Sequence, residues 1–425
     1  MKILNNFEDS KKFIENFLRK TGPDDSLYKI CNEIGENIRK NGDVALKKYL
    51  FEFDNFDMEY ELDSKSIDKS FSNVSEDFIK SITTSIKRSK QFHKNSLPKS
   101  WMNSNNSLGE NIIPVERALC YVPSGTAPLV STVVMTVVPA KIAGVKEVIV
   151  TSPAINNNVS DEIVVAAKLA GADRVFLLGG AHSIFAFTYG TKSIPKSDLI
   201  CGPGNKYVTE AKRQVFGKVG IDGLYGPTET LVIADKSNDI ELCAADLIAQ
   251  AEHDVEATPI LISNSLDFSK KVEKEIYKQA ETLPRKDIIL ESFKLNGLLF
   301  VVENMIESIE LANLISSEHV SILSEEIINN YKKIVNAGGI FLGDDSAEVF
   351  GDYIAGPSHV MPTGGSARFN SALNVRHFLK YQPVINLSKK EVLSVLDDVI
   401  NLAEFEKLDG HAKSALKRKK KILGE

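Results

Sequence analysis

The sequence contains little cysteine and no long apolar run. Its 425 residues include 4 cysteines, which lie far apart and form no C-x-x-C pair, and this spacing excludes the disulfide framework of a small secreted domain. The most apolar stretch, near residues 132–144, spans about 13 residues and contains Lys141, whereas a membrane-spanning helix needs about 20. The first residues, MKILNNFEDSKK, lack the apolar segment of a secretory signal. We therefore expect reduced thiols, no membrane association and a cytoplasmic location.

An excess of positive charge is also missing. Lysine and arginine number 51 against 57 aspartate and glutamate residues, which gives a net charge of −6. Nucleic acids and anionic membranes attract basic proteins, so this acidic chain is not expected to bind either of them. Charged residues make up 25% and apolar residues 43% of the chain, as is usual for globular proteins. Composition thus indicates a large soluble protein and does not specify its activity.

Repeats and low-complexity segments are absent, and from residue 120 the chain alternates regularly between apolar β-rich runs and helical patterns. Such alternation indicates βαβ units and parallel sheets. The predicted strands cover residues 147–151, 174–178, 198–201 and 230–234 in a first block, and 258–263, 298–302, 320–323 and 340–342 in a second. Two such blocks predict an α/β protein with two Rossmann-like, doubly wound domains side by side, which bind ligands beyond the carboxyl ends of their strands.

The two ends of the chain are predicted to be helical. Residues 9–50 indicate two helices joined at Thr21-Gly22-Pro23, and a further helix begins at Val44. Near the other end, a capping box from Ser388 to Glu391 opens a helix that runs to about residue 406, and Asp409-Gly410 separates it from a last helix. The predicted domains are a helical segment at 1–20, a discontinuous α/β domain at 21–118 and 235–368, a second α/β domain at 119–234, and a helical tail at 369–425.

Two glycine-bearing segments precede predicted helices. One is Gly202-Pro203-Gly204-Asn205, which follows a predicted strand, and the other reads YVPSGTAP at residues 121–128. Free N–H groups at the start of a helix favour an anion such as a pyrophosphate. No complete G-x-G-x-x-G motif occurs in the chain, however, and a tight strand-to-helix turn explains the first segment equally well.

Two pairs of residues combine groups suited to metal binding or proton transfer. Gln250 and His253 lie three positions apart at the end of a predicted helix, so both can face one metal ion, although this short pattern is common by chance. Glu318 and His319 join a predicted helix to a strand, and a carboxylate with an imidazole is the usual acid–base pair. An exposed pair of loop residues is the alternative at that junction.

Two further segments bring titratable residues into turns. Residues 351–365 are rich in turn residues and contain Asp352 and His359, which are potential ligands or bases. Glu406 and His411 flank the break in the tail, across which their side chains could converge.

Together these segments resemble the histidinol dehydrogenase family over nearly the whole chain. Several matching stretches occur in order and with compatible spacing, which makes the resemblance specific. They are YVPSGTAP (121–128), CGPGNKYVTEAKRQV (201–215), GPTETLVIAD (226–235), AADLIAQAEHD (244–254), SEHV (317–320), GDYIAGPSHVMPTGGSARF (351–369) and EKLDGH (406–411).

The resemblance implies a homodimeric enzyme that uses zinc, or manganese, and NAD. Such an enzyme oxidises a small molecule, L-histidinol, through L-histidinal to L-histidine in the last steps of histidine biosynthesis. It implies that Glu318 activates water and that His319 takes the alcohol proton. The tail, with Glu406 and His411, would reach the site of the neighbouring subunit, and residues 119–234 would form the NAD side.

The remaining implied roles follow residue by residue from the matching motifs. The metal ligands would be Gln250, His253, Asp352 and His411. The dinucleotide would contact Tyr121, His182 and Asn205. The substrate would contact Thr228, Gln250, His253, His319, Asp352, Glu406 and His411.

The chain departs from the usual family pattern at four positions. Ser124 replaces a glycine, His182 a glutamine of the dinucleotide site, Thr228 a serine beside the substrate, and Ser317 a proline. The extra methyl group of Thr228 could reshape the substrate pocket. The alternative prediction is therefore a paralogue that oxidises another vicinal polar alcohol, such as dihydroxypropanesulfonate, with NAD.

Overall fold

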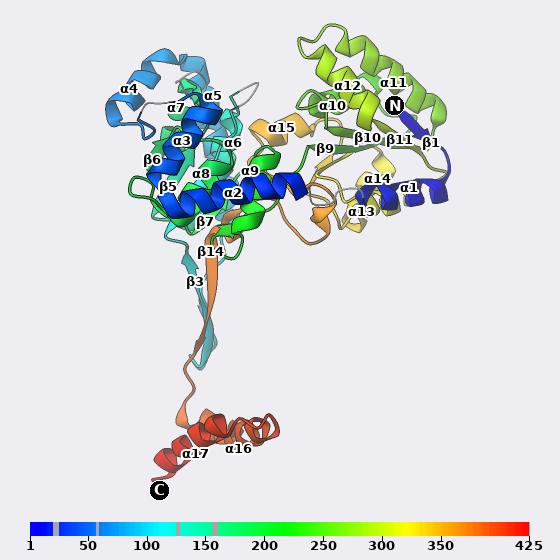
Figure 1. The fold of residues 1–425 in the computed structure, drawn as a ribbon. Helices are drawn as coiled ribbons and strands as arrows, with labels where there is room; N and C mark the ends of the chain where they lie inside the picture. The colour runs from blue at the N-terminus through cyan, green and yellow to red at the C-terminus, as the bar shows by residue number, and fades with distance from the viewer. Residues whose placement is uncertain (20–24, 57–58, 125–127, 155–159, 425) are drawn as a thin grey trace. The chain divides into compact units, whose positions relative to one another are not determined.

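The structure is a computed structural model that describes residues 1–19, 25–56, 59–124, 128–154 and 160–424 (Figure 1). Contacts divide the chain into two compact units, which are described separately: residues 1–97 with 115–378, and residues 98–114 with 379–425. Within the described ranges, no helix combines the length and the apolar character that crossing a membrane requires.

The first unit contains a parallel five-stranded sheet with the order β6-β5-β4-β7-β8. Its strands are short and apolar on both faces, as in sheets covered by helices on both sides. The elements are β4 (Arg117–Tyr121), α6 (Val130–Ala143), β5 (Glu147–Thr151), α7 (Asp161–Ala170), β6 (Arg174–Phe176), α8 (Gly180–Tyr189), β7 (Leu199–Cys201), α9 (Lys206–Val215) and β8 (Gly220–Ile221). The strand order reverses between β4 and β7, and this switch point is a usual ligand site.

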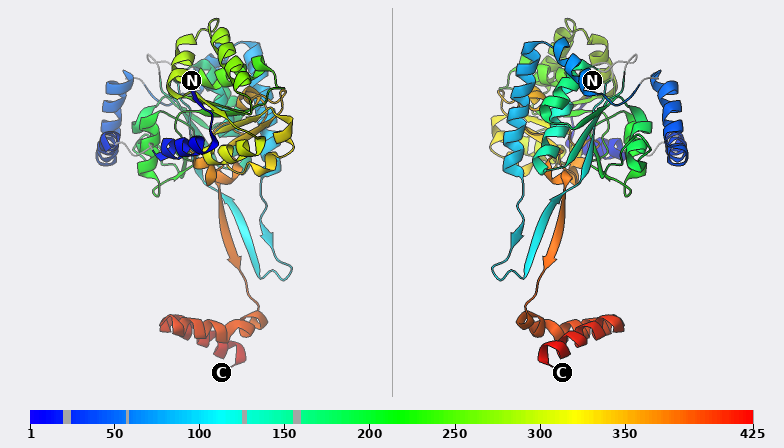
Figure 2. Two further views of the ribbon diagram at one scale, coloured as in Figure 1. Left: turned by 90° about the vertical axis from the view of Figure 1, so that its right-hand side faces the viewer. Right: turned by 90° about the vertical axis from the view of Figure 1, so that its left-hand side faces the viewer.

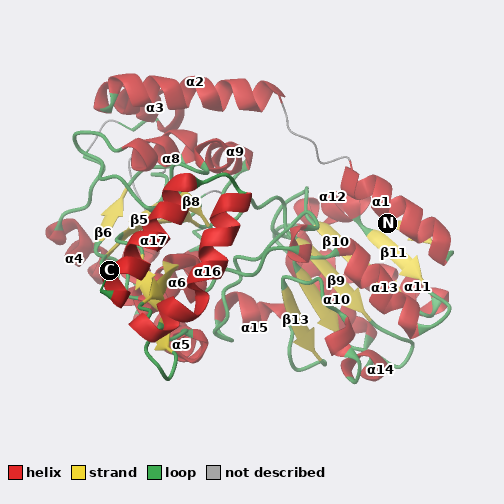
Figure 3. Ribbon diagram, turned by 90° about the horizontal axis from the view of Figure 1, so that it is seen from below, coloured by secondary structure: helices red, strands yellow, loops and turns green. Residues whose placement is uncertain are grey.

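The same unit contains a parallel six-stranded sheet with the order β1-β11-β10-β9-β12-β13. Its order reverses between β9 and β12, so it is also doubly wound. Figure 3 labels its strands β9, β10, β11 and β13. Its elements are β9 (Glu229–Ile233), α10 (Ile240–Ala251), β10 (Thr258–Ser263), α11 (Leu266–Ala280), α12 (Lys286–Asn296), β11 (Leu298–Val301), α13 (Met305–Ile315), β12 (His319–Ile322), α14 (Glu325–Ile328), β13 (Gly339–Leu342) and α15 (Glu348–Tyr353). The predicted α/β class with two doubly wound sheets is confirmed.

One strand lies in a different sheet from the one predicted. The run at 230–234 was expected to be the fourth strand of the first block, but β9 pairs with β10 and β12 in the centre of the six-stranded sheet. The very short β8, which the sequence pattern does not reveal, takes the outer place in the first sheet. An apolar run indicates that a strand is buried but not which strands it pairs with, and this explains the error.

The N-terminal segments are divided between the two sheets. The strand β1 (Lys2–Leu4) pairs with β11 at the edge of the six-stranded sheet, and α1 (Phe7–Arg19) packs against α13. The helices α2 (Asp25–Asn41), α3 (Asp43–Asp54), α4 (Ser64–Asn73) and α5 (Glu76–Ser96) follow. Of these, α2 contacts α8 and α9, α4 contacts α7, and α5 contacts α6. The helices that they contact belong to the five-stranded sheet. The predicted boundaries instead grouped residues 21–118 with residues 235–368, whose strands lie in the six-stranded sheet. The predicted turn at Thr21-Gly22-Pro23 lies outside the described residues.

The second unit is an antiparallel sheet followed by two helices (Figure 2). Its strands, in the order β14-β3-β2, are β14 (Leu379–Ile385), β3 (Leu108–Pro114) and β2 (Trp101–Met102). The predicted capping box at Ser388 and Glu391 is present and opens α16 (Lys389–Phe405). The chain turns at Lys407, whose φ is 58°, and α17 (Asp409–Leu423) begins at Asp409. The predicted break at Asp409-Gly410 is therefore two residues too late, and the helical tail predicted for 369–425 also contains the strand β14.

Candidate active site

Glu318 and His319 lie where α13 leads into β12. Ser316 adopts a left-handed conformation that ends α13, and β12 begins at His319. In the pairing with β9, His319 is opposite Thr230, so Glu318 lies beside Glu229 at the amino ends of both strands. The candidate residues of this sheet thus lie at its amino edge, whereas the sequence-based expectation placed ligands beyond the carboxyl ends. A helix-to-strand junction in a parallel sheet lies at the amino edge, because the helix returns the chain to the start of the next strand.

The Glu318 carboxylate is buried and held by two donors. Its Oε2 atom lies 2.7 Å from the Thr228 hydroxyl and accepts a hydrogen bond of 3.1 Å from the Glu229 backbone N–H. Burial raises the pKa of Glu318 to about 7, although the His319 charge and the two hydrogen bonds oppose this shift. A carboxylate with this pKa can accept a proton near neutral pH.

His319 is buried between carboxylates. Its Nδ1 atom lies 3.7 Å from Glu318 Oε2, and its Nε2 atom lies 3.6 Å from Asp352 Oδ1. Burial lowers the pKa of His319, but the neighbouring charges of Glu318, Asp352 and Glu348 outweigh burial and raise it to about 10. The Nε2 atom is buried and makes no hydrogen bond. This surrounding favours the imidazolium form and leaves one ring nitrogen available to a ligand.

Three predicted metal ligands come from α10, the residues after it, and α15. The buried Gln250 lies in the last turn of α10. Its Oε1 lies 3.1 Å from the Thr228 hydroxyl, and its Nε2 donates to Asp352 Oδ2 at 3.4 Å. His253 lies close enough to Asp352 for the carboxylate to oppose the lowering of its pKa by burial. The structure therefore places Asp352 beside His319 and connects Gln250 to Glu318 through the Thr228 hydroxyl.

The donor types of these side chains fit a zinc ion. Among the described residues, no group of three or more His, Cys, Asp or Glu side chains is arranged to hold a metal. Amide oxygen, imidazole and carboxylate are nevertheless donors that zinc accepts. The unpartnered, buried Nε2 of His319 beside Asp352 also shows that the polar groups here are not fully satisfied by one another.

Glu348 was not identified from the sequence. It is fully buried on α15, and its Oε1 accepts hydrogen bonds from Thr230 and Ser321, on the face of the sheet that carries His319. The available signal was its spacing, since a residue four positions before Asp352 on a helix lies on the same side. His359, a potential ligand or base by its sequence context, hydrogen-bonds through Nδ1 to the Asp352 backbone oxygen at 2.9 Å.

The predicted dinucleotide residues lie at the carboxyl ends of the five-stranded sheet. Tyr121 ends β4, and its buried hydroxyl accepts a hydrogen bond from the Gly180 N–H. His182 is buried in α8 and lies 3.1 Å from Asp54 Oδ2. Asn205 caps α9, because its side-chain oxygen accepts from two backbone amides of that helix. Gly125, in the middle of the segment 121–128, lies outside the described residues.

The loop at Gly202 favours the tight-turn alternative over the pyrophosphate site. Its first amide is not free, because Gly202 N donates to Asp222 Oδ2 at 2.7 Å. Asn205 accepts from two N–H groups at the start of α9. The protein thus supplies its own acceptors where a bound anion would otherwise be needed.

Glu406 and His411 belong to the second unit. Glu406 follows the last residue of α16, and His411 lies in the first turn of α17. Both side chains are exposed.

Comparisons with known proteins agree with these motifs. A family model described as histidinol dehydrogenase matches residues 18–419. A histidinol dehydrogenase from Dehalococcoides mccartyi is 42% identical over 92% of this chain and 90% of its own length, and one from Thermus thermophilus is 42% identical over 92% and 94%. The crystal structure of histidinol dehydrogenase from Elizabethkingia anophelis superposes with a TM-score of 0.93 and 31% identity, covering 99% of this chain and 98% of that one.

The chain belongs to the histidinol dehydrogenase family. The resemblance inferred from the motifs is therefore confirmed, and the protein is an oxidoreductase of that family.

At two of the four positions where the chain departs from the usual pattern of histidinol dehydrogenases, Thr228 and His182, the structure shows specific side-chain contacts. The Thr228 hydroxyl lies within hydrogen-bonding distance of both Glu318 and Gln250, so the change from serine keeps the polar contacts and adds a methyl group beside them. His182 faces Asp54, near the rings of Tyr49 and Phe53. Ser317 is fully buried, and Ser124 forms an isolated bridge with Pro128.

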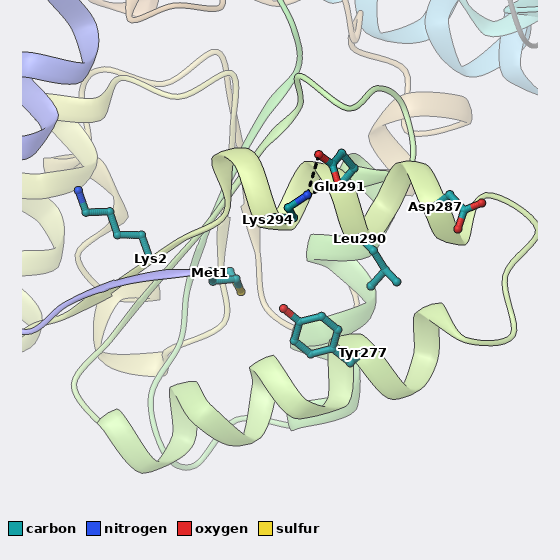
Figure 4. A pocket seen from close by; sticks show the side chains of 7 residues that line it. All are labelled: Met1, Lys2, Tyr277, Asp287, Leu290, Glu291 and Lys294. Atoms are coloured by element: carbon teal, nitrogen blue, oxygen red, sulfur yellow. Dashed lines mark hydrogen bonds and ion pairs between the residues drawn. The ribbon is translucent and has the colours of Figure 1, made fainter.

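A separate hollow near the N-terminus shares none of the candidate site residues. It has a volume of about 580 Å³ and is lined by Met1, Lys2, Tyr277, Asp287, Leu290, Glu291 and Lys294 (Figure 4). Lys294 is paired with Glu291, and Lys2 lies over the Phe13 ring. None of the buried, unpartnered side-chain atoms found in the described residues belongs to this hollow. The hollow is therefore distinct from the candidate site around Glu318.

Proposed function

We propose that this protein is a zinc- and NAD-dependent histidinol dehydrogenase. It would convert L-histidinol, water and two NAD⁺ into L-histidine, two NADH and three protons at one site. The buried Glu318 and His319 pair, connected through Thr228 to Gln250, is the observation that carries the proposal. Family membership supports the same reaction.

In the first oxidation, neutral His319 would take the proton of the substrate alcohol, and NAD⁺, when bound, would supply the acceptor for the hydride of the carbinol carbon. Its Nε2 atom has no hydrogen-bond partner within the chain. Glu318 and Asp352, on opposite sides of the ring, stabilise the imidazolium that forms. Because Glu318 and Asp352 raise the pKa of His319 to about 10, the neutral base form would be favoured only once a metal cation at Asp352 offsets the carboxylate charge.

In the second oxidation, Glu318 would take a proton from the water that attacks the aldehyde carbon, and a second NAD⁺, when bound, would supply the hydride acceptor. The Thr228 hydroxyl and the Glu229 amide hold the Glu318 carboxylate in position. Its pKa of about 7 keeps it basic enough to accept that proton.

The proposed metal ligands are Gln250, His253, Asp352 and His411. When bound, zinc or manganese would act as a Lewis acid that orients the substrate's imidazole and amino groups. The proposed substrate contacts are these four residues together with Thr228, His319 and Glu406. The proposed dinucleotide contacts are Tyr121, His182 and Asn205.

We also propose a cytoplasmic homodimer in which Glu406 and His411 complete the site of the partner subunit. The support is the family resemblance of the EKLDGH segment at residues 406–411. The exposure of both side chains leaves them available to a second chain.

A paralogue that acts on another vicinal alcohol is the second candidate function. The methyl group of Thr228 favours it, because this side chain lies beside Gln250 and Glu318, where the substrate is expected.

The test is turnover of histidinol by zinc-loaded protein. We expect two NADH per histidinol, loss of activity with a chelator, and recovery when zinc is added back. Absence of NADH with histidinol contradicts the first proposal. NADH from a small set of vicinal diols and amino alcohols, without histidinol turnover, supports the paralogue instead.

A further inference from the structure

A buried ion pair that no catalytic step uses lies beside the predicted dinucleotide loop. Lys212 on α9 is 1% exposed and Asp222 is 6% exposed. Lys212 Nζ lies 2.5 Å from Asp222 Oδ1 and donates to the Gly202 carbonyl at 3.0 Å. The ammonium group also lies 4.8 Å from the centre of the Tyr225 ring. Both charges are therefore removed from solvent and have specific partners.

The pair holds Gly202 by both of its backbone polar groups. Asp222 Oδ2 accepts from Gly202 N at 2.7 Å, Lys212 donates to Gly202 O, and Asp222 Oδ1 also accepts from Gly223 N at 2.8 Å. Gly202 has a φ of +108°, and a Cβ atom there would lie 2.1 Å from the Tyr121 carbonyl oxygen. The pair thus keeps the loop in close contact with the end of β4.

Stability alone is a poor reason for this arrangement. Burying two charges costs desolvation energy, and apolar residues of the same size are often at least as stabilising as a buried pair. Such a pair does, however, restrict geometry, because each charge requires its partner in one place.

The ion pair lies near residues of two sites, the predicted dinucleotide site and the candidate site around Glu318. Tyr121, one predicted dinucleotide contact, lies against Gly202 in space. Asn205, another predicted dinucleotide contact, follows Gly202 in the same loop. After Asp222, the chain passes Tyr225, whose carbonyl accepts from Thr209 on α9, and reaches Thr228 at the Glu318 site.

We propose that Lys212 and Asp222 are a positioning pair that sets the affinity for the dinucleotide by holding the Gly202–Asn205 loop against Tyr121. The ligand class, a nicotinamide dinucleotide, rests on the proposed function. The pair does not contact the reacting atoms and acts through the loop. Its loss weakens NAD binding and leaves histidinol binding nearly unchanged.

The experiment compares Lys212→Met, Asp222→Asn and the double variant with the full-length, zinc-loaded wild type. We expect KM for NAD to rise about tenfold and KM for histidinol to change less than about twofold, which marks a loss of binding to one substrate. Hydrogen exchange of the peptide covering residues 201–205 is expected to speed up about tenfold. Lys141→Met, which removes the exposed pair with Asp173, is the matched control and leaves all three quantities unchanged.

The double variant separates positioning from stability. It removes both charges, so it avoids the uncompensated buried charge of each single variant and is expected to fold even where the single variants do not. A folded double variant with wild-type KM for NAD and wild-type exchange in the loop overturns the proposal, as does an equal rise in both KM values.

Direct titration of NAD, without histidinol, keeps this inference separate from the proposed reaction. If the wild type binds NAD but does not oxidise histidinol, the proposed function fails, and weaker NAD binding by the variants still supports the positioning pair. If the wild type binds no NAD, both proposals fail.

Discussion

At the scale of single residues, the site depends on how two neighbours in sequence are surrounded. Glu318 accepts hydrogen bonds at the amino edge of the sheet, whereas His319 lies between two carboxylates and stacks near Phe341, with ring centres 5.8 Å apart. Burial raises the pKa of Glu318, and negative charges raise that of His319. The same edge can therefore supply a neutral-range carboxylate and a stabilised imidazolium.

The variant Glu318→Gln tests the assignment of the second oxidation. Because glutamine cannot take the proton of the attacking water, we expect oxidation of histidinal to slow by about 10²- to 10⁴-fold, while one NADH per site still forms from histidinol in a single turnover. In the wild type, the rate of histidinal oxidation should rise as the pH passes through about 7, where Glu318 ionises. Stopped-flow NADH absorbance measures both. An unchanged histidinal rate contradicts the assignment; the exposed Glu325→Gln is the control.

The variant Glu229→Gln tests how much the charge of a second buried carboxylate lowers the free energy of unfolding. Burial and the Glu318 charge raise the pKa of Glu229 to about 7 from an ordinary value of 4.5. The folded state therefore binds this proton more tightly than the unfolded state, and the wild type loses stability as pH rises from about 4.5 to about 7. Glutamine resembles the protonated acid, so we expect Glu229→Gln to match the wild type at pH 5 and to unfold at higher urea concentration at pH 8. Equal differences at both pH values would disprove this.

At the scale of elements, the loop between β7 and α9 shows what a glycine is needed for. Gly202 and Gly171 have similar φ angles of +108° and +103°, but a Cβ atom would clash with backbone only at Gly202; at Gly171 its nearest neighbour is Lys141 Cγ at 3.6 Å. We expect Gly171→Ala to cost about 1–2 kcal/mol from backbone strain alone.

Gly202→Ala carries the same strain and in addition displaces the loop from Tyr121. We therefore expect a larger loss of unfolding free energy than for Gly171→Ala, together with a raised KM for NAD that Gly171→Ala does not show. Urea denaturation and steady-state kinetics measure the two effects. Similar results for both variants would show that the close approach to Tyr121 is unimportant.

Elements with strong local signals were predictable, and those that depend on distant partners were not. The capping box of α16 at Ser388 was readable, because its hydrogen bonds lie within one turn. The two-residue strand β8 and the strand β14 were missed, because they exist only through pairing with β7 and β3. Residues 60–118 contain α4 and α5, for which no prediction was made.

At the scale of the whole molecule, the proposal that the tail completes a partner's site predicts complementation. Glu318→Gln damages one part of the proposed site and His411→Ala the other. In an equal mixture that exchanges subunits, half of the dimers are hybrids. If His411 acts on the partner, each hybrid has one intact site and one damaged site. About a quarter of wild-type activity should therefore return. Co-expression with two affinity tags, followed by the histidinol assay, measures this. No recovered activity in purified hybrids contradicts the exchange.

The sequence by itself determined the α/β class, the family and the set of candidate residues. Helical and strand periodicities are local, and motifs such as CGPGNKYVTEAKRQV and SEHV are contiguous in the chain. The tertiary structure decided which sheet contains β9, which edge carries Glu318, and that Asp222 and Lys212 hold Gly202. These features depend on burial and hydrogen bonding between segments far apart in sequence, and the energies of such contacts are set only when the chain has folded.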